Sequence, residues 1–412
     1  FRRVLFRSKA CHGDECPYAR GFYDRLPQAR KEATGHAVLD RDGVESLARR
    51  HQVCPYQLAT ELVPWFDVVI GDYFYFYGLN ALLRSDDDSV AGRGVLIDEV
   101  HNLPDRARGM YSSALRKVDL MMVRRLLTGR PRKAADALNR RFLELNRQEF
   151  AVEGRYLSNK LPDTLTDALA NFVVAVSEAM AGEGGYLPAH PELMEFFFSC
   201  LQFLRVAELI DNDYLVECRR EGGRQGLVIE LRCLDPARLL AERHTSAASL
   251  TGFSATLSPQ DWIAAELGLD EDAVVSRLDS PFDASQLRLL VDTSVDTRYR
   301  ARETSLKLLV QRLDAWIARS HQNTVVYFPS YRYLQQFLDN WNAGNGERDI
   351  WVQTREQDEH QRRELIELLQ TSTGVLGFCV LGGVFGEGVD LPGQALCRVA
   401  VVGVGTPQPS PA

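Results

Sequence analysis

The stretch Val95-Leu96-Ile97-Asp98-Glu99-Val100-His101 decides the fold class. An apolar run that ends in charged residues is typical of a buried strand leading into a turn. In α/β domains that handle phosphate, a carboxylate at this point holds Mg²⁺, and a neighbouring carboxylate can polarise the attacking water. Asp98 and Glu99 are therefore candidate catalytic residues, with Asp98 as the candidate Mg²⁺ ligand. The alternative interpretation is a strand end with two solvated acids.

The composition limits the class of protein. The chain has 412 residues, of which 45% are hydrophobic and 25% charged, with a formal net charge of -8. These values are ordinary for a globular protein of several domains. No apolar run approaches the length of a membrane span, so we expect a cytoplasmic protein without a membrane partner. Nucleic-acid binding would depend on local basic surfaces, because the chain as a whole is acidic.

The eight cysteines fall into two groups. Five of them lie in apolar or strand-like sequence and are expected to be small buried hydrophobes: Cys200, Cys218, Cys233, Cys379 and Cys397. The other three, Cys11, Cys16 and Cys54, lie in polar, loop-like sequence. No apolar segment of secretory type opens the chain, which favours metal or cluster ligation over disulfides. A zinc site with His51 as the fourth ligand is one possibility, because zinc accepts the His-x-x-Cys spacing.

The order of the expected elements indicates two α/β regions around an insertion. Residues 67–71 and 94–98 are predicted to be buried strands, and helices are expected near 19–33, 43–50 and 54–62. Residues 105–210 show helical periodicity, followed by a hairpin around residues 221–224. From about residue 285, expected strands at 325–328, 350–352, 375–378 and 399–402 alternate with helices near 303–319, 331–339 and 356–371. This alternation predicts a second, doubly wound α/β domain.

Three further segments accompany the Asp98–His101 motif. Ser254-Ala255-Thr256 follows an expected strand, and its hydroxyls could relay a change at a nucleotide by hydrogen bonding. Val325-Val326-Tyr327-Phe328-Pro329-Ser330 is a strand that runs into a polar turn. The fourth segment, residues 382–393, is rich in glycine, which allows close approach of the backbone to phosphate. Its candidate cofactor-binding residues are Gly386, Glu387, Gly388 and Asp390.

In their order and spacing these four segments resemble the motifs of superfamily 2 helicases, and the insertions resemble those of the iron–sulfur helicases of the XPD/DinG family. Asp98 to His101 matches a DEAH-type motif II, and Ser254 to Thr256 matches motif III. The resemblance implies two doubly wound, RecA-like motor domains, the first with an inserted iron–sulfur cluster domain and a helical arch domain. The expected ranges are 1–63 for the cluster domain, 64–104 and 241–284 for motor domain 1, 105–240 for the arch and 285–412 for motor domain 2.

The family implies ATP, Mg²⁺ and a four-iron four-sulfur cluster. Cys11, Cys16 and Cys54 match three of four cluster ligands, and the fourth is expected before Cys11, where residues 1–8 resemble foreign sequence. Asp98 would hold Mg²⁺, Glu99 would activate water, and His101, Ser254 and Thr256 would couple the nucleotide to domain movement. The implied activity is ATP-dependent 5′–3′ translocation on single-stranded DNA and unwinding of forked or tailed duplexes in DNA repair or replication. We expect a monomer.

One element of an ATP-driven motor is missing from the sequence. The chain contains no Gly-Lys dipeptide, which a P-loop requires to cradle the β- and γ-phosphates. The resemblance places the P-loop before residue 1 and the arginine-bearing motif VI after residue 412, so this chain alone is expected to turn over no ATP. Two alternatives remain open: a degenerate, non-catalytic nucleic-acid-binding module, and a nuclease-linked or RNA-directed motor with the same fold.

The expected contacts with DNA are basic and aromatic. Binding of single strands combines cationic grooves with aromatic stacking. Residues 298–302 (Arg-Tyr-Arg-Ala-Arg) and 328–333 (Phe-Pro-Ser-Tyr-Arg-Tyr) have this composition. The aromatic run Tyr73-Phe74-Tyr75-Phe76-Tyr77 is more simply explained by packing against the core.

Overall fold

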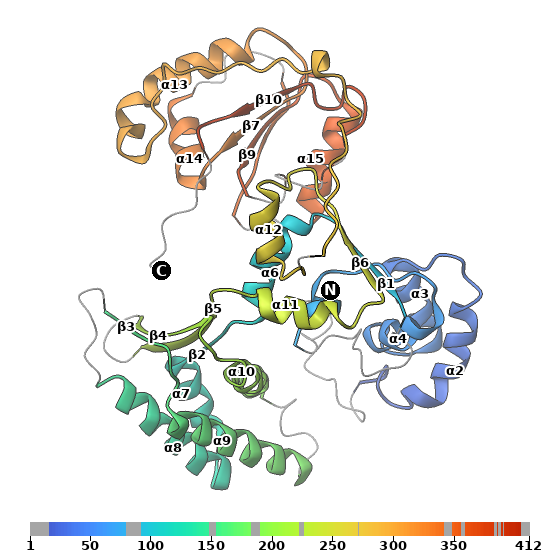
Figure 1. Ribbon diagram of the computed structural model, residues 1–412, viewed down its shortest axis with the longest axis vertical. Coiled ribbons are helices and arrows are strands. Elements are labelled where there is room, and N and C mark those ends of the chain that lie inside the picture. Colours follow the sequence, from blue (N-terminus) through green and yellow to red (C-terminus); the bar gives the residue numbers. More distant parts are fainter. Residues whose placement is uncertain are drawn as a thin grey trace. The chain divides into compact units, whose positions relative to one another are not determined.

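The computed structural model describes residues 16–79, 92–147, 154–182, 190–221, 226–270, 272–341, 348–355, 359–382, 385, 389 and 391–404. Contacts divide the chain into two units, of which the first ends at Arg277 and the second begins at Leu278. The described elements of unit 1 (Figure 1) are α2 (Phe22–Ala33), α3 (Arg41–His51), α4 (Pro55–Leu62), η1 (Val63–Trp65), α5 (Phe74–Tyr77), β1 (Gly94–Ile97), η2 (Val100–Asn102), α6 (Leu103–Met110), β2 (Ser113–Arg116), α7 (Lys117–Leu126), α8 (Gly129–Leu145), β3 (Arg155–Ser158), α9 (Asp163–Gly182), α10 (Pro191–Ala207), β4 (Tyr214–Arg220), β5 (Leu227–Cys233), α11 (Ala237–His244), β6 (Ser249–Gly252) and α12 (Gln260–Glu266). Those of unit 2 are η3 (Ala284–Gln286), η4 (Tyr299–Ala301), α13 (Arg302–Ile317), β7 (Thr324–Phe328), α14 (Tyr331–Asn340), β8 (Ile350–Val352), α15 (Glu359–Thr371), β9 (Leu376–Val380) and β10 (Arg398–Val401).

Helices α2, α3 and α4 form a small cluster with its own core. The α3 helix begins at a side-chain cap, because the Asp40 carboxylate accepts a hydrogen bond from the Gly43 backbone N–H at 2.8 Å. The α4 helix begins with Pro55 in its first turn, where the missing N–H costs nothing. Leu26, Leu47 and Leu58 are among the buried residues that join the three helices. The three helices predicted for this part of the chain are confirmed.

The strand that carries Asp98 pairs with the strand that leads to Ser254. β1 and β6 are parallel and in register from Gly94 opposite Ser249 to Ile97 opposite Gly252. The predicted strand at 94–98 is therefore confirmed as a strand, but its predicted burial is wrong, because only Ile97 of β1 is buried. The predicted buried strand at 67–71 is wrong, because residues 68–70 pair with no strand in the described part of the chain and Ile70 is 95% exposed.

The block between β1 and β6 combines helices with a sheet. β2, β5, β4 and β3 form an antiparallel sheet in that order, and helices α7 to α10 lie on one side of it (Figure 1). The predicted hairpin is confirmed as β4 and β5, which pair from Tyr214 opposite Cys233 to Arg220 opposite Leu227. The prediction of helical periodicity missed β2 and β3, each of four residues, because segments this short carry little periodic signal.

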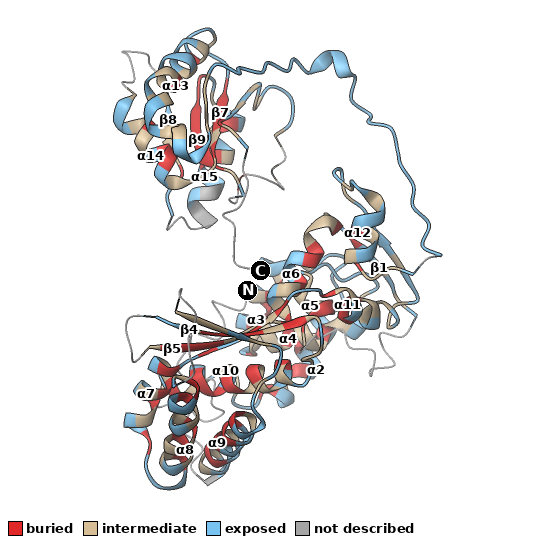
Figure 2. Ribbon diagram, turned by 60° about the vertical axis from the view of Figure 1, so that its left-hand side comes forward, coloured by how far each residue is buried: buried red, intermediate tan, exposed pale blue. Residues whose placement is uncertain are grey.

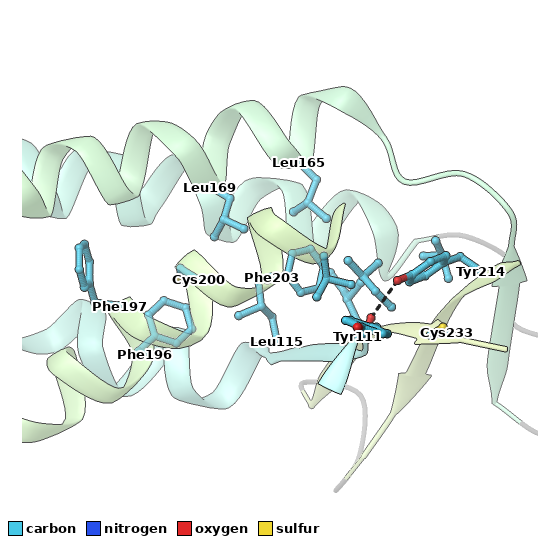
Figure 3. Close-up of a cluster of buried hydrophobic side chains, with 14 of the residues drawn as sticks. Tyr111, Leu115, Leu165, Leu169, Phe196, Phe197, Cys200, Phe203, Tyr214 and Cys233 are labelled. Carbon is cyan, nitrogen blue, oxygen red and sulfur yellow. Dashed lines mark hydrogen bonds between the residues drawn. The ribbon is translucent and has the colours of Figure 1, made fainter. Parts of the chain in front are cut away.

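One hydrophobic core joins this block to the strand of the candidate site. Buried side chains form a continuous cluster from Phe76 in α5, through Ile97 in β1, to Leu267 after α12. Figure 3 shows part of this cluster, where Phe196 and Phe203 of α10 lie beside side chains of α9 and the sheet. The inserted block is therefore packed onto the α/β part of unit 1 by a shared core.

Unit 2 is a doubly wound α/β domain, as predicted. Its sheet has the order β10-β7-β9-β8, and every pair is parallel. Alternate residues of β7 enter two cores on opposite faces: Val326 packs with α13 and α14, and Val325 packs with α15. Figure 1 shows α13 and α14 on one side of the strands and α15 on the other.

Four of the five cysteines that were expected to be buried are buried. Cys200, Cys218, Cys233 and Cys379 are buried, as expected, whereas Cys397 is exposed, so its prediction as a buried residue is wrong. Cys397 precedes β10, where the Sγ donates to the Gln394 carbonyl at 3.4 Å. Among the described residues, no helix is both long and apolar enough to cross a membrane.

Candidate active site

The turn after β1 has an unusual backbone. Ile97 is the last, buried residue of the strand, and Asp98 is exposed. Glu99 has φ 47° and ψ 46°, in the left-handed region that non-glycine residues seldom occupy. The Asp98 Oδ1 accepts a hydrogen bond from the Glu99 N–H at 2.8 Å, which helps hold this turn. Strained backbone of this kind persists where the surroundings fix it, and it is enriched at functional sites.

The loop after β6 is tied to the same turn by backbone hydrogen bonds. The Phe253 N–H donates to the Ile97 carbonyl at 3.0 Å, and the Val100 N–H donates to the Phe253 carbonyl at 3.1 Å. Gly252 allows this approach, because a Cβ at that position would lie 2.8 Å from Cγ2 of Val100. Glu99, His101 and Ser254 are thus held on adjacent segments although the serine follows 153 residues after the histidine.

Polar side chains from the two loops form one network. Oγ of Ser254 lies 2.7 Å from Nδ1 of His101 and 3.3 Å from Oε2 of Glu99. The Thr256 N–H donates to Ser254 Oγ at 3.1 Å, and the two hydroxyl oxygens are 3.5 Å apart. A serine has one hydrogen to donate, and the carboxylate can only accept it. The network is therefore satisfied when the histidine carries its proton on Nδ1 and donates it to Ser254.

Tyr73, from the aromatic run before the motif, also contacts the turn. Its hydroxyl donates to the carbonyl oxygens of Asp98 at 2.5 Å and of Glu99 at 3.0 Å. Burial raises the pKa of Tyr73, and the charges of Asp98 and Glu99 raise it further, so the phenol remains a donor. The sequence placed this run in the core, which Phe76 and Tyr77 confirm, but it did not assign Tyr73 to the site. The available signal was an aromatic residue 25 positions before Asp98, which is weak.

The structure brings together five of the predicted site residues: Asp98, Glu99, His101, Ser254 and Thr256. The predicted cofactor-binding residues Gly386, Glu387, Gly388 and Asp390 lie outside the described residues. Cys11 also lies outside them, so the predicted cluster ligand set is only partly visible.

Two of the predicted iron–sulfur ligands belong to the helical region of α2 to α4. Cys16 and Cys54 are free, partly exposed thiols, and Cys54 immediately precedes α4. Within the described ranges, no three His, Cys, Asp or Glu side chains gather into a metal site. Nε2 of His51 lies 2.6 Å from Oε2 of Glu32, and this pair lowers the pKa of Glu32. The histidine of the zinc alternative is thus already engaged with a carboxylate.

Unit 2 has a hollow at the carboxyl end of its sheet. A cavity of about 370 Å³ lies between the first turns of α14 and the residues after β8. Among the described residues its lining includes Tyr331, Arg332, Gln353 and Arg355 but no acid, and the Arg355 guanidinium lies 5.5 Å from the centre of the Tyr331 ring. In the other predicted contact segment, residues 298–302, Tyr299 is 69% exposed.

Two family models match the chain. The model named DEAD_2 matches residues 5–120, which contain the Asp98–Glu99 turn, and the model of a helicase C-terminal domain matches residues 314–412 in unit 2. Together these ranges cover just over half of the chain. The first range contains β1, and the second contains the parallel strands β7 to β10.

The relatives that match this chain are also helicases. A probable ATP-dependent helicase of Methanocaldococcus jannaschii is 31% identical over 168 residues, which are 38% of this chain and 24% of the relative. The ATP-dependent DNA helicase CHL1 of Candida glabrata is 22% identical over 96% of this chain and 52% of its own length. The regulator of telomere elongation helicase 1 homolog of Drosophila virilis is 21% identical over 90% and 46%. The chain thus spans about half, or less, of the length of these relatives.

A solved XPD helicase has the same fold. It superposes with a TM-score of 0.53 at 17% sequence identity, covering 96% of this chain and 71% of the solved chain. At this identity the likeness concerns the fold, and the family models and relatives carry the assignment. The chain belongs with the helicases that carry DEAD_2 and helicase C-terminal domains, and its fold is that of a solved XPD helicase.

Proposed function

We propose that the protein carrying this chain is an ATP-dependent DNA helicase that translocates 5′ to 3′ on single-stranded DNA and unwinds forked or tailed duplexes. The observation that supports this most directly is the contact of 2.7 Å between Nδ1 of His101 and Oγ of Ser254. It joins the loop of the two acids to the Ser254–Thr256 loop, and Ser254 in turn donates to Glu99. A change at Glu99 can therefore reach a second loop through one hydroxyl.

The two acids suit different tasks in phosphoryl transfer. Asp98 is exposed, and the Glu99 N–H orients its carboxylate, so Asp98 is placed to hold a hydrated Mg²⁺ ion through oxygen. Bound Mg²⁺ would neutralise charge on the transferred phosphoryl group. Glu99 is turned toward Ser254 by the left-handed backbone and would accept the proton of the attacking water.

The remaining polar residues would sense the state of Glu99. When Glu99 takes up a proton it no longer needs the hydrogen of Ser254, and the hydroxyl becomes free to donate to Oγ1 of Thr256 instead. This exchange would couple hydrolysis to movement of the loop after β6. In the second motor domain, the glycine-rich segment with Gly386, Glu387, Gly388 and Asp390 is proposed to face the nucleotide.

The partners of the protein are proposed from the exposed basic and aromatic residues. In unit 2, the cavity beside Tyr331 and Arg355 offers an aromatic ring and a guanidinium, which suits a base and its phosphate. In unit 1, Cys16 and Cys54 would hold a four-iron four-sulfur cluster together with Cys11 and a fourth ligand. A thiolate-bound cluster would fix the start of α2 relative to α4, since one of these cysteines precedes each helix.

The decisive experiment is Glu99→Gln in the complete protein. The amide keeps the size of the side chain but cannot accept a proton, so we expect ATP turnover stimulated by single-stranded DNA to fall at least about 100-fold. ATP binding, measured with a fluorescent analogue, should be unchanged. Glu144→Gln, which removes a carboxylate paired with Arg141 in α8, is the control and should keep full turnover.

Two outcomes would contradict the proposal. Turnover of the Glu99→Gln protein within about twofold of the unmodified protein would remove Glu99 from the reaction. No turnover by the unmodified complete protein, together with retained binding of single-stranded DNA, would favour the non-catalytic binding module.

A further inference from the structure

We propose that Tyr73 is a positioning residue for the two acids, and that Tyr111 and Tyr214 connect it to the sheet of the inserted block. This tyrosine relay rests on the proposed function, because it acts through Asp98 and Glu99. It consists of three phenols, each of which donates to a backbone carbonyl of another segment.

The first contact fixes the backbone of the acids themselves. The Tyr73 hydroxyl lies 2.5 Å from the Asp98 carbonyl oxygen and 3.0 Å from the Glu99 carbonyl oxygen. One donor thus bridges the two peptide units on either side of the left-handed residue. A non-glycine residue in that conformation costs free energy, so contacts that favour it are needed to keep the turn. Without the phenol, Glu99 would lose one of the contacts that favour this conformation, while the hydrogen bond from its N–H to Oδ1 of Asp98 would remain.

Tyr73 is itself held in place at the start of α5. The Asp72 carboxylate accepts a hydrogen bond from the Phe74 N–H at 2.9 Å, and the Tyr73 carbonyl accepts from the Tyr77 N–H at 2.8 Å. Phe76 and Tyr77 anchor the helix in the shared core. The phenol therefore approaches the turn from a short helix that cannot rotate without disturbing buried side chains.

The other end of α5 is connected to the inserted block. The Tyr111 hydroxyl donates to the Tyr77 carbonyl at 2.8 Å, and the Tyr214 hydroxyl donates to the Tyr111 carbonyl at 3.1 Å. Tyr111 and Tyr214 are 1% and 3% exposed, so neither bond competes with bulk water. Tyr214 begins β4, and Figure 3 shows it reaching Tyr111 beside the buried side chains of α10.

The relay gives the sheet a mechanical connection to the catalytic turn. A shift of β4 would move Tyr111, and with it the carboxyl end of α5, whose amino end carries Tyr73. The hydroxyl of Tyr73 in turn contacts the backbone of the two acids. The inserted block would in this way set how well Asp98 and Glu99 are aligned, without contacting the nucleotide.

The test compares Tyr73→Phe with Tyr77→Phe in the complete protein. The Tyr77 hydroxyl has no hydrogen-bond partner within the described ranges, so its removal is a matched control on the same helix. We expect Tyr73→Phe to lower kcat about tenfold through misalignment, with the Kd for nucleotide and the melting temperature unchanged. Hydrogen exchange at residues 98–101 should increase in Tyr73→Phe and remain unchanged in Tyr77→Phe.

A double variant tests the connection to the block. Tyr214→Phe should lower kcat less than Tyr73→Phe does, and combining them should add little to the single Tyr73 variant, because both act along one path. Additive effects would show that Tyr73 acts alone and would overturn the relay. Full activity of Tyr73→Phe in a protein that Glu99→Gln inactivates would overturn the positioning role. An active Glu99→Gln protein would instead overturn the proposed function.

Discussion

The two central parallel strands of unit 2, β7 and β9, are buried, whereas the strands that carry the candidate active site in unit 1 are largely exposed (Figure 2). Every residue of β9 and four of the five in β7 are buried. In β1 only Ile97 is buried, and Leu96 is 75% exposed. The carboxyl edge of the sheet in unit 2 is therefore fixed by two cores. The corresponding edge in unit 1 depends on close packing and polar contacts at the turn itself.

This difference predicts how each region fails. A change in the core of unit 2 should weaken the whole unit, because its buried strands contribute to the same two cores. A change at the turn of unit 1 should disturb the acids while most of the unit stays folded, because the shared core lies mainly between the inserted sheet and its helices.

The largest expected effect is that of Asn323→Ala, just before β7. The Asn323 Nδ2 lies 2.9 Å from the carbonyl oxygens of Leu369, Ser372 and Ala395, and its Oδ1 accepts from the Val375 N–H at 3.0 Å. Asn323 is 3% exposed, so its loss leaves several buried groups without partners. We expect unit 2 to lose about 3 kcal/mol of stability.

Urea unfolding combined with hydrogen exchange checks this prediction. Exchange should rise throughout β7, β9 and β10 but not in β1 or β6. Asn340→Ala, which removes an exposed amide bonded to the Gln336 carbonyl, is the control and should cost less than about 0.5 kcal/mol. Increased exchange confined to residues 321–324 would contradict the view that burial joins the strands of unit 2 into one cooperative unit.

The next effect tests the close packing in unit 1. In Gly252→Ala the new Cβ would lie 2.8 Å from Cγ2 of Val100, a stiff side chain that is 2% exposed. Val100 must shift, and it separates Glu99 from His101. We expect a loss of about 2 kcal/mol in stability, with increased hydrogen exchange at residues 98–101.

Relief of the crowding distinguishes this cause from a general defect. Val100→Ala should recover part of the loss in the double variant, because it removes the methyl groups that collide. Gly109→Ala, in α6, should not destabilise the chain, because the substitution brings the new Cβ within 4 Å of no neighbouring side chain among the described residues. Strictly additive losses in the double variant would show that Gly252 is needed for another reason.

The sequence predicted the elements of unit 2 better than those around the site. The strands of unit 2 alternate with helices at regular spacing, and burial on both faces gives them continuous apolar runs such as Val325–Phe328. Residues 67–71 have the same apolar character but pair with no strand in the described part of the chain. An apolar run indicates a strand only where a partner completes its hydrogen bonds, and one sequence cannot show the partner.

The candidate site shows the same limit for side chains. Asp98, Glu99, His101, Ser254 and Thr256 could be predicted because their residue types and order are specific. Tyr73 could not be, because its contribution is a hydroxyl directed at backbone carbonyls. The carbonyl acceptors carry no sequence signal, since every residue has one. The left-handed conformation of Glu99 could not be predicted either, because glutamate has no preference for that backbone region.

The smallest expected effect concerns pH, and it contrasts two histidines. His244, at the end of α11 just before β6, packs edge-on against Tyr77 at 5.7 Å, and neither ring nitrogen has a hydrogen-bond partner among the residues that the structure describes. Burial lowers the pKa of His244, which the charge of Asp270 only partly offsets. His321 in unit 2 is exposed.

The sign follows from the lowered pKa of His244. Between its pKa in the folded chain and the ordinary value of about 6.5, the unfolded chain binds more protons than the folded one. The stability of unit 1 is therefore complete above about pH 6.5 and decreases as the pH falls toward the folded pKa. His244→Phe should keep the packing on Tyr77 and reduce this loss, whereas His321→Phe should leave the pH dependence of unit 1 unchanged. Urea unfolding followed by hydrogen exchange at pH 7.5 and at pH 5.5 measures the stability of both variants. If unit 1 lost the same stability on acidification with and without His244, the burial of His244 would not be what makes the region of the active site sensitive to protons.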